Sequence, residues 1–395
     1  MTNLFGIDAL PYGVFCTEGA APRIGVRYGE DVIDLGELAA RPGGSCPVDP
    51  AVFAAASLNP MMALGRPAWT AIRGWVRHTV SGGDLPATAV RPSSQVTMQL
   101  PIEIGDYVDF YASENHATNV GRIFRPDGAA LTPNWKHLPI GYHGRSGTIV
   151  VDGTDIVRPC GQRKGPNDPA PVFGPCTRLD IEAELGFVIG KDSTLGEPVT
   201  LAQAADYLFG VVILNDWSAR DIQAWEYVPL GPFLGKSFAS SISAWVLPFE
   251  ALAEATFELP DQDPAPLPYL SDGPRRGLRI QLEVELDGQI ISRPDYAGMY
   301  WSPEQMVAHL TVNGASTRVG DLLGSGTVSG SAADTRGSLL ELTWSGAEPL
   351  TLADGSTRSF LQDGDTIRIS AWAPGPDGSR IGLGPVTGTI RPARG

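Results

Sequence analysis

The segment Leu179-Asp180-Ile181-Glu182-Ala183-Glu184-Leu185 alternates apolar and acidic side chains at every position. Successive side chains of a β-strand point to opposite faces, so this alternation predicts a strand with its acids on one face. Short apolar runs between turn residues predict further strands on both sides of this segment. They are expected at residues 23–28, 31–35, 147–151, 181–189, 210–214, 278–286, 339–344 and 366–371.

Helices are predicted at few places. Residues 50–80 carry Ala, Leu, Met and Trp at helical spacing. A capping box, Thr200 with Gln203, predicts the start of one later helix. A second box begins at Ser302 and has proline at the first helical position. Because 47 glycines and 34 prolines favour turns and short strands, the expected fold class is mainly β (α+β), with a few helices.

The length of the chain suggests two domains. A chain of 395 residues exceeds the size of a typical single domain. Residues 1–100 are expected to form a small β unit that includes the helical stretch. A boundary near residues 95–105 leads into the second domain, residues 101–395, in which strands and loops predominate.

Composition narrows the classes of partner and location. The net charge of −15 argues against nucleic acid or an anionic membrane, and an anionic substrate would need local basic residues in its cleft. The N-terminal sequence lacks the basic and apolar regions of a signal peptide, and the longest apolar run, near Phe209–Leu214, is too short to cross a bilayer. The cysteines show no CxxC spacing, which favours a reducing, cytoplasmic location. They are Cys16, Cys46, Cys160 and Cys176.

The acids of the opening segment allow two interpretations. Asp180, Glu182 and Glu184 are consistent with an acidic, solvent-facing side of a half-exposed strand. Carboxylates that share a strand face lie about 7 Å apart, and they can also bind one hard cation together. The alternation alone leaves both interpretations open.

A second polar pattern follows a buried apolar run that ends at Asp216. If the next residues are helical, Asp216, Arg220, Gln223 and Tyr227 share one helix face. An acid, a guanidinium, an amide and a phenol are unusual on a core-facing stripe. A salt-bridged surface helix remains an equally good explanation of the pattern.

Histidine is concentrated in one part of the chain. His116, His137 and His143 lie close together, although the chain has 5 histidines in total. Asp109 and Tyr111 precede His116, so a proton-transfer role for His116 is as well supported as a structural one. Arg125 and Tyr142 lie in the same loop-rich stretch; ordinary surface positions explain them equally well.

The segment from Gly231 to Ser237 looks like a phosphate-binding loop but has one residue too few between its glycines. Its proline, phenylalanine and leucine would also obstruct a cradle of backbone N–H groups. Nucleotide binding is therefore rejected. Lys236 stays notable, because a lysine among apolar and small residues is costly unless it meets anions.

Several long segments of the chain resemble the fumarylacetoacetase family. The resemblance runs from about residue 105 to the end of the chain and includes the N-terminal region. Segments this long and this numerous are more specific than any single spacing. They are Asp109–Gly121 (Asp-Phe-Tyr-x-x-x-x-His-Ala-Thr-Asn-Val-Gly), Pro133–Trp135, Leu138–Arg145, Asn215–Gln223, Trp225–Phe238 and Ser325–Gly330.

The resemblance implies a fold and a reaction. The expected fold is a small SH3-like N-terminal β-barrel followed by a larger mixed β-roll domain that holds the site. The expected reaction is hydrolysis of the C–C bond of 4-fumarylacetoacetate, a small dianionic β-diketone acid, to fumarate and acetoacetate, the last step of tyrosine and phenylalanine catabolism. The resemblance also implies a homodimer and a bound Ca²⁺ and/or Mg²⁺.

The resemblance assigns roles to individual residues. A general base falls on His116, oriented by Glu341, and Arg220 and Lys236 fall near the reacting carbonyl. Ser240 stands where the family often has Thr, and the hydroxyl is kept. The metal ligands fall on Asp109, Glu182, Glu184 and Asp216; a second cation position falls on Asp216, Lys236 and Ser240; and substrate contacts fall on Tyr111, Arg125, Tyr142, Gln223, Tyr227 and Thr327. His137 and His143 receive no role.

Charge and chemistry fit this scheme, and two alternatives stay open. Four clustered carboxylates carry −4, a divalent cation reduces this to −2, and Lys236 with Arg220 would balance it. One alternative is another diketone or acylpyruvate hydrolase, or a decarboxylase, of the same superfamily. The other is a non-catalytic module that binds divalent cations.

Overall fold

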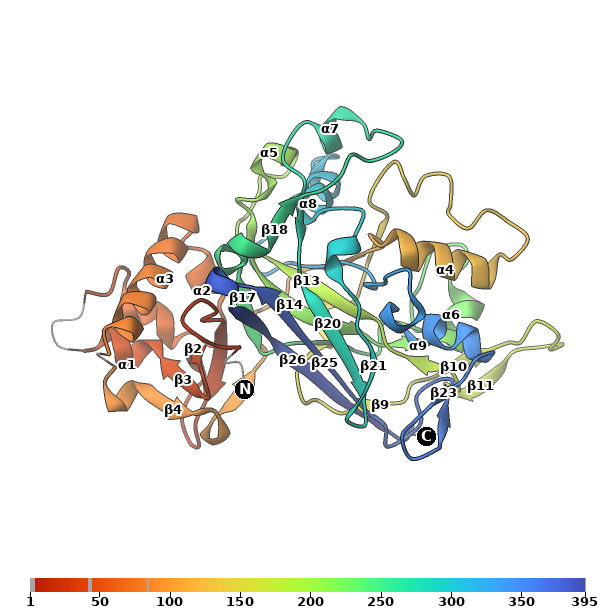
Figure 1. The fold of residues 1–395 in the computed structure, drawn as a ribbon, viewed down its shortest axis with the longest axis horizontal. Coiled ribbons are helices and arrows are strands. Elements are labelled where there is room, and N and C mark those ends of the chain that lie inside the picture. The colour runs from red at the N-terminus through yellow and green to blue at the C-terminus, as the bar shows by residue number, and fades with distance from the viewer. Residues whose placement is uncertain (1–3, 42–44, 84, 395) are drawn as a thin grey trace.

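A mixed sheet of 13 strands runs through the middle of the computed structural model, which describes residues 4–41, 45–83 and 85–394 (Figure 1). Its main path has the order β4-β3-β2-β1-β17-β14-β13-β22-β6-β7; β5 pairs with β1, and β16 pairs with β14 and β8. Pairing is antiparallel except between β22 and β6 and between β16 and β8. The strands are β1 Tyr12–Cys16, β2 Arg23–Tyr28, β3 Asp31–Asp34, β4 Val90–Pro92, β5 Thr97–Gln99, β6 Tyr107–Phe110, β7 Gly141–His143, β8 Ile149–Val151, β13 Ala183–Ile189, β14 Leu208–Asp216, β16 Ser240–Ile242, β17 Trp245–Pro248 and β22 Leu322–Gly324.

The first 100 residues supply one end of this sheet, and their hydrophobic core is shared with apolar residues of β13, β14, β16, β17 and β22. The helices there are α1 Leu35–Ala39, α2 Asn59–Met62 and α3 Arg66–Ser81. As the helical spacing predicts, α3 buries one apolar face, made by Trp69, Ile72, Val76 and Val80. Because β1 pairs with β17, these strands continue into the large sheet, and the pairings of the described residues define no separate closed barrel.

A second, five-stranded sheet packs against the central strands of the first (Figure 1). Its order is β21-β20-β25-β26-β9, and the inward residues of β25 and β26 belong to the same core as β13 and β14. A fold of mostly strands with few helices confirms the mainly β, α+β class. The bounds are β9 Ile156–Val157, β20 Gln281–Leu286, β21 Gln289–Ser292, β25 Thr366–Pro374 and β26 Arg380–Arg391.

The capping boxes identified in the sequence do start helices. α5 (Leu201–Ala204) begins after Thr200 and α8 (Pro303–Thr311) after Ser302, each with its reciprocal cap. No helix in the described part of the chain has the length and hydropathy required to cross a membrane.

Three local expectations were wrong. Residues 339–344 hold a short helix, α9 (Leu339–Leu342), because the Ser338 hydroxyl caps its first turn and the apolar run is buried on all sides. The alternating strand is split into β12 (Leu179–Asp180) and β13. The proposed helix face beginning at Asp216 is also interrupted, because Asp216 ends β14 and the helix α6 begins only at Arg220 and ends at Glu226.

Candidate active site

Four buried carboxylates meet where β6, β13 and β14 approach one another. They belong to Asp109, Glu182, Glu184 and Asp216, called the acid cluster below, and one oxygen of each lies within 4.8 Å of the others. Asp109 is paired with Gly324 of β22 in register, and β22 also pairs with β13. A Cβ atom at Gly324 would lie 2.8 Å from Asp109 Oδ1 and 3.1 Å from Glu184 Oε2. Glycine at this position therefore gives two of the carboxylates room to converge.

Two buried cations neutralise one side of the acid cluster. Lys236 Nζ donates to Glu182 Oε2 at 2.5 Å and to Asp216 Oδ2 at 2.6 Å. Arg220 pairs with Glu182 Oε1 at 2.6 Å and donates through Nε to Asp180 Oδ2 at 2.8 Å. Glu182 and Asp216 therefore have strong ionic partners within the chain, as the burial of charge requires.

The remaining acids of the cluster are poorly paired. Burial raises the pKa of Asp109 and of Glu184 well above the usual range, and the charges of neighbouring carboxylates raise both further. Burial also raises the pKa of Asp216, although Lys236 opposes this shift. For Glu182 the effect of burial is outweighed by Lys236 and Arg220, which hold its pKa below the usual value.

The acid cluster fits a divalent cation. Asp109 Oδ1 and Glu184 Oε1 are buried and have no hydrogen-bond partner among the residues that the structure describes, so two oxygens are left for a ligand. Carboxylate oxygens are the ligands that hard cations such as Ca²⁺ and Mg²⁺ prefer. Ser240 Oγ donates to Asp216 Oδ1 at 2.6 Å and orients this carboxylate.

A buried imidazole–carboxylate pair lies beside the acid cluster. His116, near the start of α4 (Glu114–Phe124), contacts Glu341 Oε2 through Nδ1 at 2.7 Å. Glu341 also accepts hydrogen bonds from Asn119 Nδ2 at 2.9 Å, Ser329 Oγ at 2.9 Å and Ser338 Oγ at 2.8 Å. Burial raises the pKa of Glu341, but His116 and these donors outweigh it, so the pKa is lowered. The chain thus holds Glu341 as a fixed anion facing one ring nitrogen.

A cavity of about 180 Å³, called the inner cavity below, connects the acid cluster to His116. The Tyr111 ring packs edge-on against the His116 ring at 5.2 Å between centroids. Within the described ranges the buried hydroxyl of Thr327 has no hydrogen-bond partner, so it can bind a ligand there. The lining residues are Asp109, Phe110, Tyr111, His116, Ile140, Gly141, Tyr142, Glu182, Pro232, Lys236, Gly326 and Thr327.

Three residues expected to touch substrate lie outside the lining of the inner cavity. Arg125 is exposed at the end of α4 and donates to the carbonyl oxygen of Ala130 at 2.9 Å. Gln223 Oε1 accepts from Arg220 at 3.3 Å, and the side chain of Tyr227 is exposed. Their expected contacts therefore require a substrate that extends beyond this cavity.

The residues that hold the site from behind were identified only in part from the sequence. Asp180 was a candidate cation ligand in the acidic alternation, but it lies outside the acid cluster. Asp180 accepts from Arg220 and from the backbone N–H groups of Leu339 and Leu340, which ties α9 to the acid cluster. Asn119 and Ser329 give no sequence signal. Ser338 does, because it stands three residues before Glu341 in the Ser-x-x-Glu pattern of a helix start.

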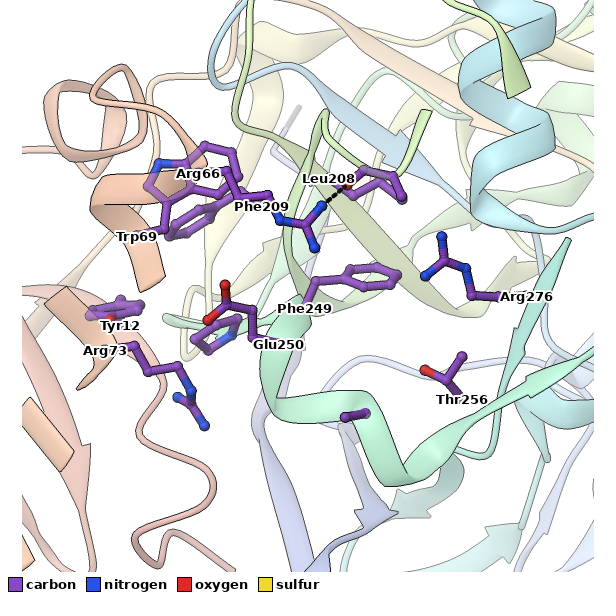
Figure 2. A pocket seen from close by; sticks show the side chains of 13 residues that line it. Tyr12, Arg66, Trp69, Arg73, Leu208, Phe209, Phe249, Glu250, Thr256 and Arg276 are labelled. Carbon is purple, nitrogen blue, oxygen red and sulfur yellow. Dashed lines mark hydrogen bonds between the residues drawn. The ribbon is translucent and has the colours of Figure 1, made fainter. Parts of the chain in front are cut away.

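Another cavity, of about 170 Å³, lies between α3, the start of β14 and the end of β17 (Figure 2). Trp69 and Phe209 form an edge-to-face pair at 5.1 Å between ring centroids, and Arg66 pairs with Asp206 at 2.8 Å. None of the acid cluster lines this cavity. It therefore belongs to the junction between the first 100 residues and the rest, and not to the candidate site.

Both parts of the chain match models of known protein families. A family model described as fumarylacetoacetase N-terminal matches residues 8–101, and one described as fumarylacetoacetate (FAA) hydrolase C-terminal matches residues 107–391. The fumarylacetoacetase of Homo sapiens is 46% identical over 98% of this chain and 96% of its own. That of Arabidopsis thaliana is 45% identical, with the same coverage of 98% and 96%.

Solved structures support the fold alone. A fumarylacetoacetate hydrolase from psychrophilic Exiguobacterium antarcticum has a TM-score of 0.57 at 17% identity, covering 98% of this chain and 100% of its own. Maleylpyruvate hydrolase from Sphingobium sp. SYK-6 has a TM-score of 0.53 at 16% identity, covering 97% and 100%.

Proposed function

Because the chain belongs to the fumarylacetoacetate hydrolase family over nearly its whole length, we propose that it hydrolyses 4-fumarylacetoacetate to fumarate and acetoacetate. The observation that carries this proposal is one cavity that joins the acid cluster to the His116–Glu341 pair. A carboxylate-fixed imidazole suits activation of water, and clustered carboxylates suit a cation that stabilises negative charge.

His116 acts as the base in this proposal. Its Nδ1 faces Glu341, so Nε2 is left to take a proton from water in the inner cavity. The hydroxide oxygen bonds to the ketone carbon of the fumaryl group, which becomes the second carboxylate of fumarate. The bond between this carbon and the neighbouring CH₂ group then breaks, and its electron pair leaves with acetoacetate as an enolate. The former CH₂ carbon of the enolate receives the proton held by His116 and becomes the methyl group of acetoacetate. Glu341 stabilises the imidazolium between these transfers.

Charge that develops on the substrate would meet one cationic donor on the cavity wall, with a second cation behind it. Lys236 lines the inner cavity, and Arg220 lies directly behind Glu182. Both side chains stay cationic, because the carboxylates around them outweigh burial and raise the pKa of each. Preorganised cations of this kind stabilise an oxyanion without reorganisation.

We propose that the bound cation is Ca²⁺ or Mg²⁺. The residues that would hold it are Asp109, Glu182, Glu184 and Asp216. When bound, it would supply Lewis acidity toward the diketone oxygens and toward the leaving enolate. Asp216, Lys236 and Ser240 are joined by hydrogen bonds, so a second cation at this position would have to displace the Lys236 ammonium group.

Substrate contacts fall into two groups. Tyr111, Tyr142 and Thr327 line the inner cavity and are assigned to the reacting part of the substrate. Arg125, Gln223 and Tyr227 lie outside it and are assigned to the part of the substrate that extends beyond.

The proposal extends to domain organisation, location and assembly. We infer an SH3-like unit in residues 1–100, a catalytic β-roll domain in residues 101–395, and a cytoplasmic location that suits four cysteines without a disulfide. A homodimer is supported by apolar side chains exposed between residues 225 and 234, since contiguous apolar surface marks subunit contacts. Leu230 is 96% exposed, Val228 67% and Phe233 65%. Light scattering of the purified protein tests the dimer.

The loss of substrate absorbance tests the reaction. Metal-loaded protein is expected to consume 4-fumarylacetoacetate and to release fumarate and acetoacetate in equal amounts, measured by chromatography. Turnover of acylpyruvates or oxaloacetate in preference to this substrate would favour another member of the superfamily. Cation binding without any turnover would leave a non-catalytic module.

A further inference from the structure

A second cavity of about 180 Å³ adjoins the inner cavity and has no role in the scheme above. Three residues, Tyr142, Pro232 and Lys236, line both cavities, so the two cavities adjoin each other. We call the second one the outer chamber. Its lining residues are Tyr142, His143, Gly144, Arg145, Pro232, Phe233, Lys236 and Ser237.

The outer chamber differs from the inner cavity in charge. Asp109 and Glu182 line the inner cavity, whereas the described part of the chain places no carboxylate in the lining of the outer chamber. Arg145 is exposed, and no ion pair or hydrogen bond of its guanidinium is found among the described residues. A cation without an ionic partner next to the candidate site is notable in a chain of net charge −15, because it adds local positive charge that can attract an anion.

The chain fixes the walls of the outer chamber relative to each other. β7 is held on β6 in a register that pairs Asp109 with Tyr142 and Val108 with His143. A Cβ atom at Gly144 would collide with the Tyr107 ring, so a glycine is needed where the chain leaves β7 toward Arg145. Thr148 Oγ1 then donates to the carbonyl oxygen of Ser237 at 2.8 Å, which ties this turn to the opposite wall.

We propose that the outer chamber is an anion subsite that binds a terminal carboxylate of the substrate or product, with Arg145 as its charged donor and His143 as a second donor. The inference rests on the proposed function, which supplies a ligand with a carboxylate at each end. A guanidinium binds carboxylate through two parallel hydrogen bonds. The subsite gives a role to His143. Arg145 then supplies the local positive charge that an acidic protein needs to bind a dianion.

Arg145→Met, Arg145→Lys and the control Arg394→Met test the subsite. The control removes the same charge from an exposed arginine that lines neither cavity. For Arg145→Met we expect KM to rise about three- to tenfold with kcat nearly unchanged, the range given by an exposed ion pair and a charge-assisted hydrogen bond. Lysine is expected to restore part of the loss, and the control should behave as wild type.

Fumarate binding to the metal-loaded protein, measured by calorimetry, separates this inference from the proposed function. The expected result is a fumarate affinity that falls by a similar factor in Arg145→Met and becomes less sensitive to salt. Unchanged KM and unchanged fumarate affinity in Arg145→Met would overturn the subsite while leaving hydrolysis intact. A wild-type protein that binds fumarate through Arg145 but hydrolyses nothing would keep the subsite and remove the proposed function.

Discussion

The acid cluster and the His116–Glu341 pair both border one cavity, but the protein supplies a full set of hydrogen-bond donors only to the carboxylate of the pair. Glu341 accepts hydrogen bonds from His116, Asn119, Ser329 and Ser338, and its pKa is lowered. In the acid cluster Asp109 Oδ1 and Glu184 Oε1 have no partner, and the pKa of both acids is raised. The pair is thus preorganised by the protein, whereas the acid cluster is preorganised for something that must be added.

This difference separates two kinds of buried charge. A buried carboxylate surrounded by donors stabilises its own ionised form and stays in place through the reaction. A buried carboxylate beside other carboxylates costs stability until a cation binds, and part of the binding free energy offsets that cost. Folding and cation binding should therefore be coupled at the acid cluster and uncoupled at the pair.

Metal removal is expected to have the largest effect. Treatment with a chelator should lower kcat by about 10³- to 10⁵-fold, since a Lewis acid supplies several kcal/mol of transition-state stabilisation. The melting temperature should fall as well, because a ligand that binds the native state stabilises it. Activity and melting are measured before and after adding back Ca²⁺ or Mg²⁺, with chelator presaturated with metal as control. Full activity of metal-free protein would show that the acid cluster requires no added cation for catalysis.

Replacing the base should lower the rate without disturbing the acid cluster. His116→Ala is expected to lower kcat by about 10²- to 10⁴-fold, the usual contribution of general base catalysis. Metal content and the metal-dependent shift in melting temperature should stay at wild-type values, because His116 is not a ligand in this scheme. A near-normal kcat would remove His116 from the role of base.

Glu341→Gln tests whether the carboxylate charge matters beyond its shape. We expect kcat to fall by about 10- to 100-fold, as for loss of a hydrogen bond to a charged group worth about 1.5–3 kcal/mol. Because the folded-state pKa of Glu341 is lowered, its charge stabilises the fold above the unfolded-state pKa, and this stabilisation is lost as the pH falls through the folded-state pKa. The stability difference between wild type and variant, measured by urea unfolding, should therefore narrow in acid. A difference independent of pH would argue against a charged Glu341.

Local sequence patterns predicted the parts of the site that lie on one element. The alternation at residues 179–185 placed Glu182 and Glu184 close together, and the buried run before Asp216 predicted a strand that ends in an acid. The capping boxes predicted α5 and α8 because a helix start depends on neighbours within one turn.

Contacts between distant elements could not be read from periodicity. Glu341 meets His116 across 225 positions, and it does so from a short helix that the apolar run predicted as a strand. A short, fully buried run has no polar face, so periodicity cannot separate helix from strand there. The strand order that brings β6 beside β13 through β22 is likewise a property of the whole fold. The resemblance supplied the His116–Glu341 pairing, but it also named Arg125, which lies outside the inner cavity.

The smallest expected effect concerns Ser240, whose hydroxyl donates to Asp216 Oδ1 at 2.6 Å. Ser240→Ala leaves this buried carboxylate with one donor fewer and should lower stability by about 1–2 kcal/mol and metal affinity less than about tenfold. Ser240→Thr keeps the hydroxyl but adds a methyl group. It is therefore the control for a change in packing without loss of the hydrogen bond. Both variants are compared by urea unfolding and by metal titration. If alanine and threonine weaken metal binding equally, the effect arises from packing, and the Ser240 hydroxyl does not orient Asp216 for the cation.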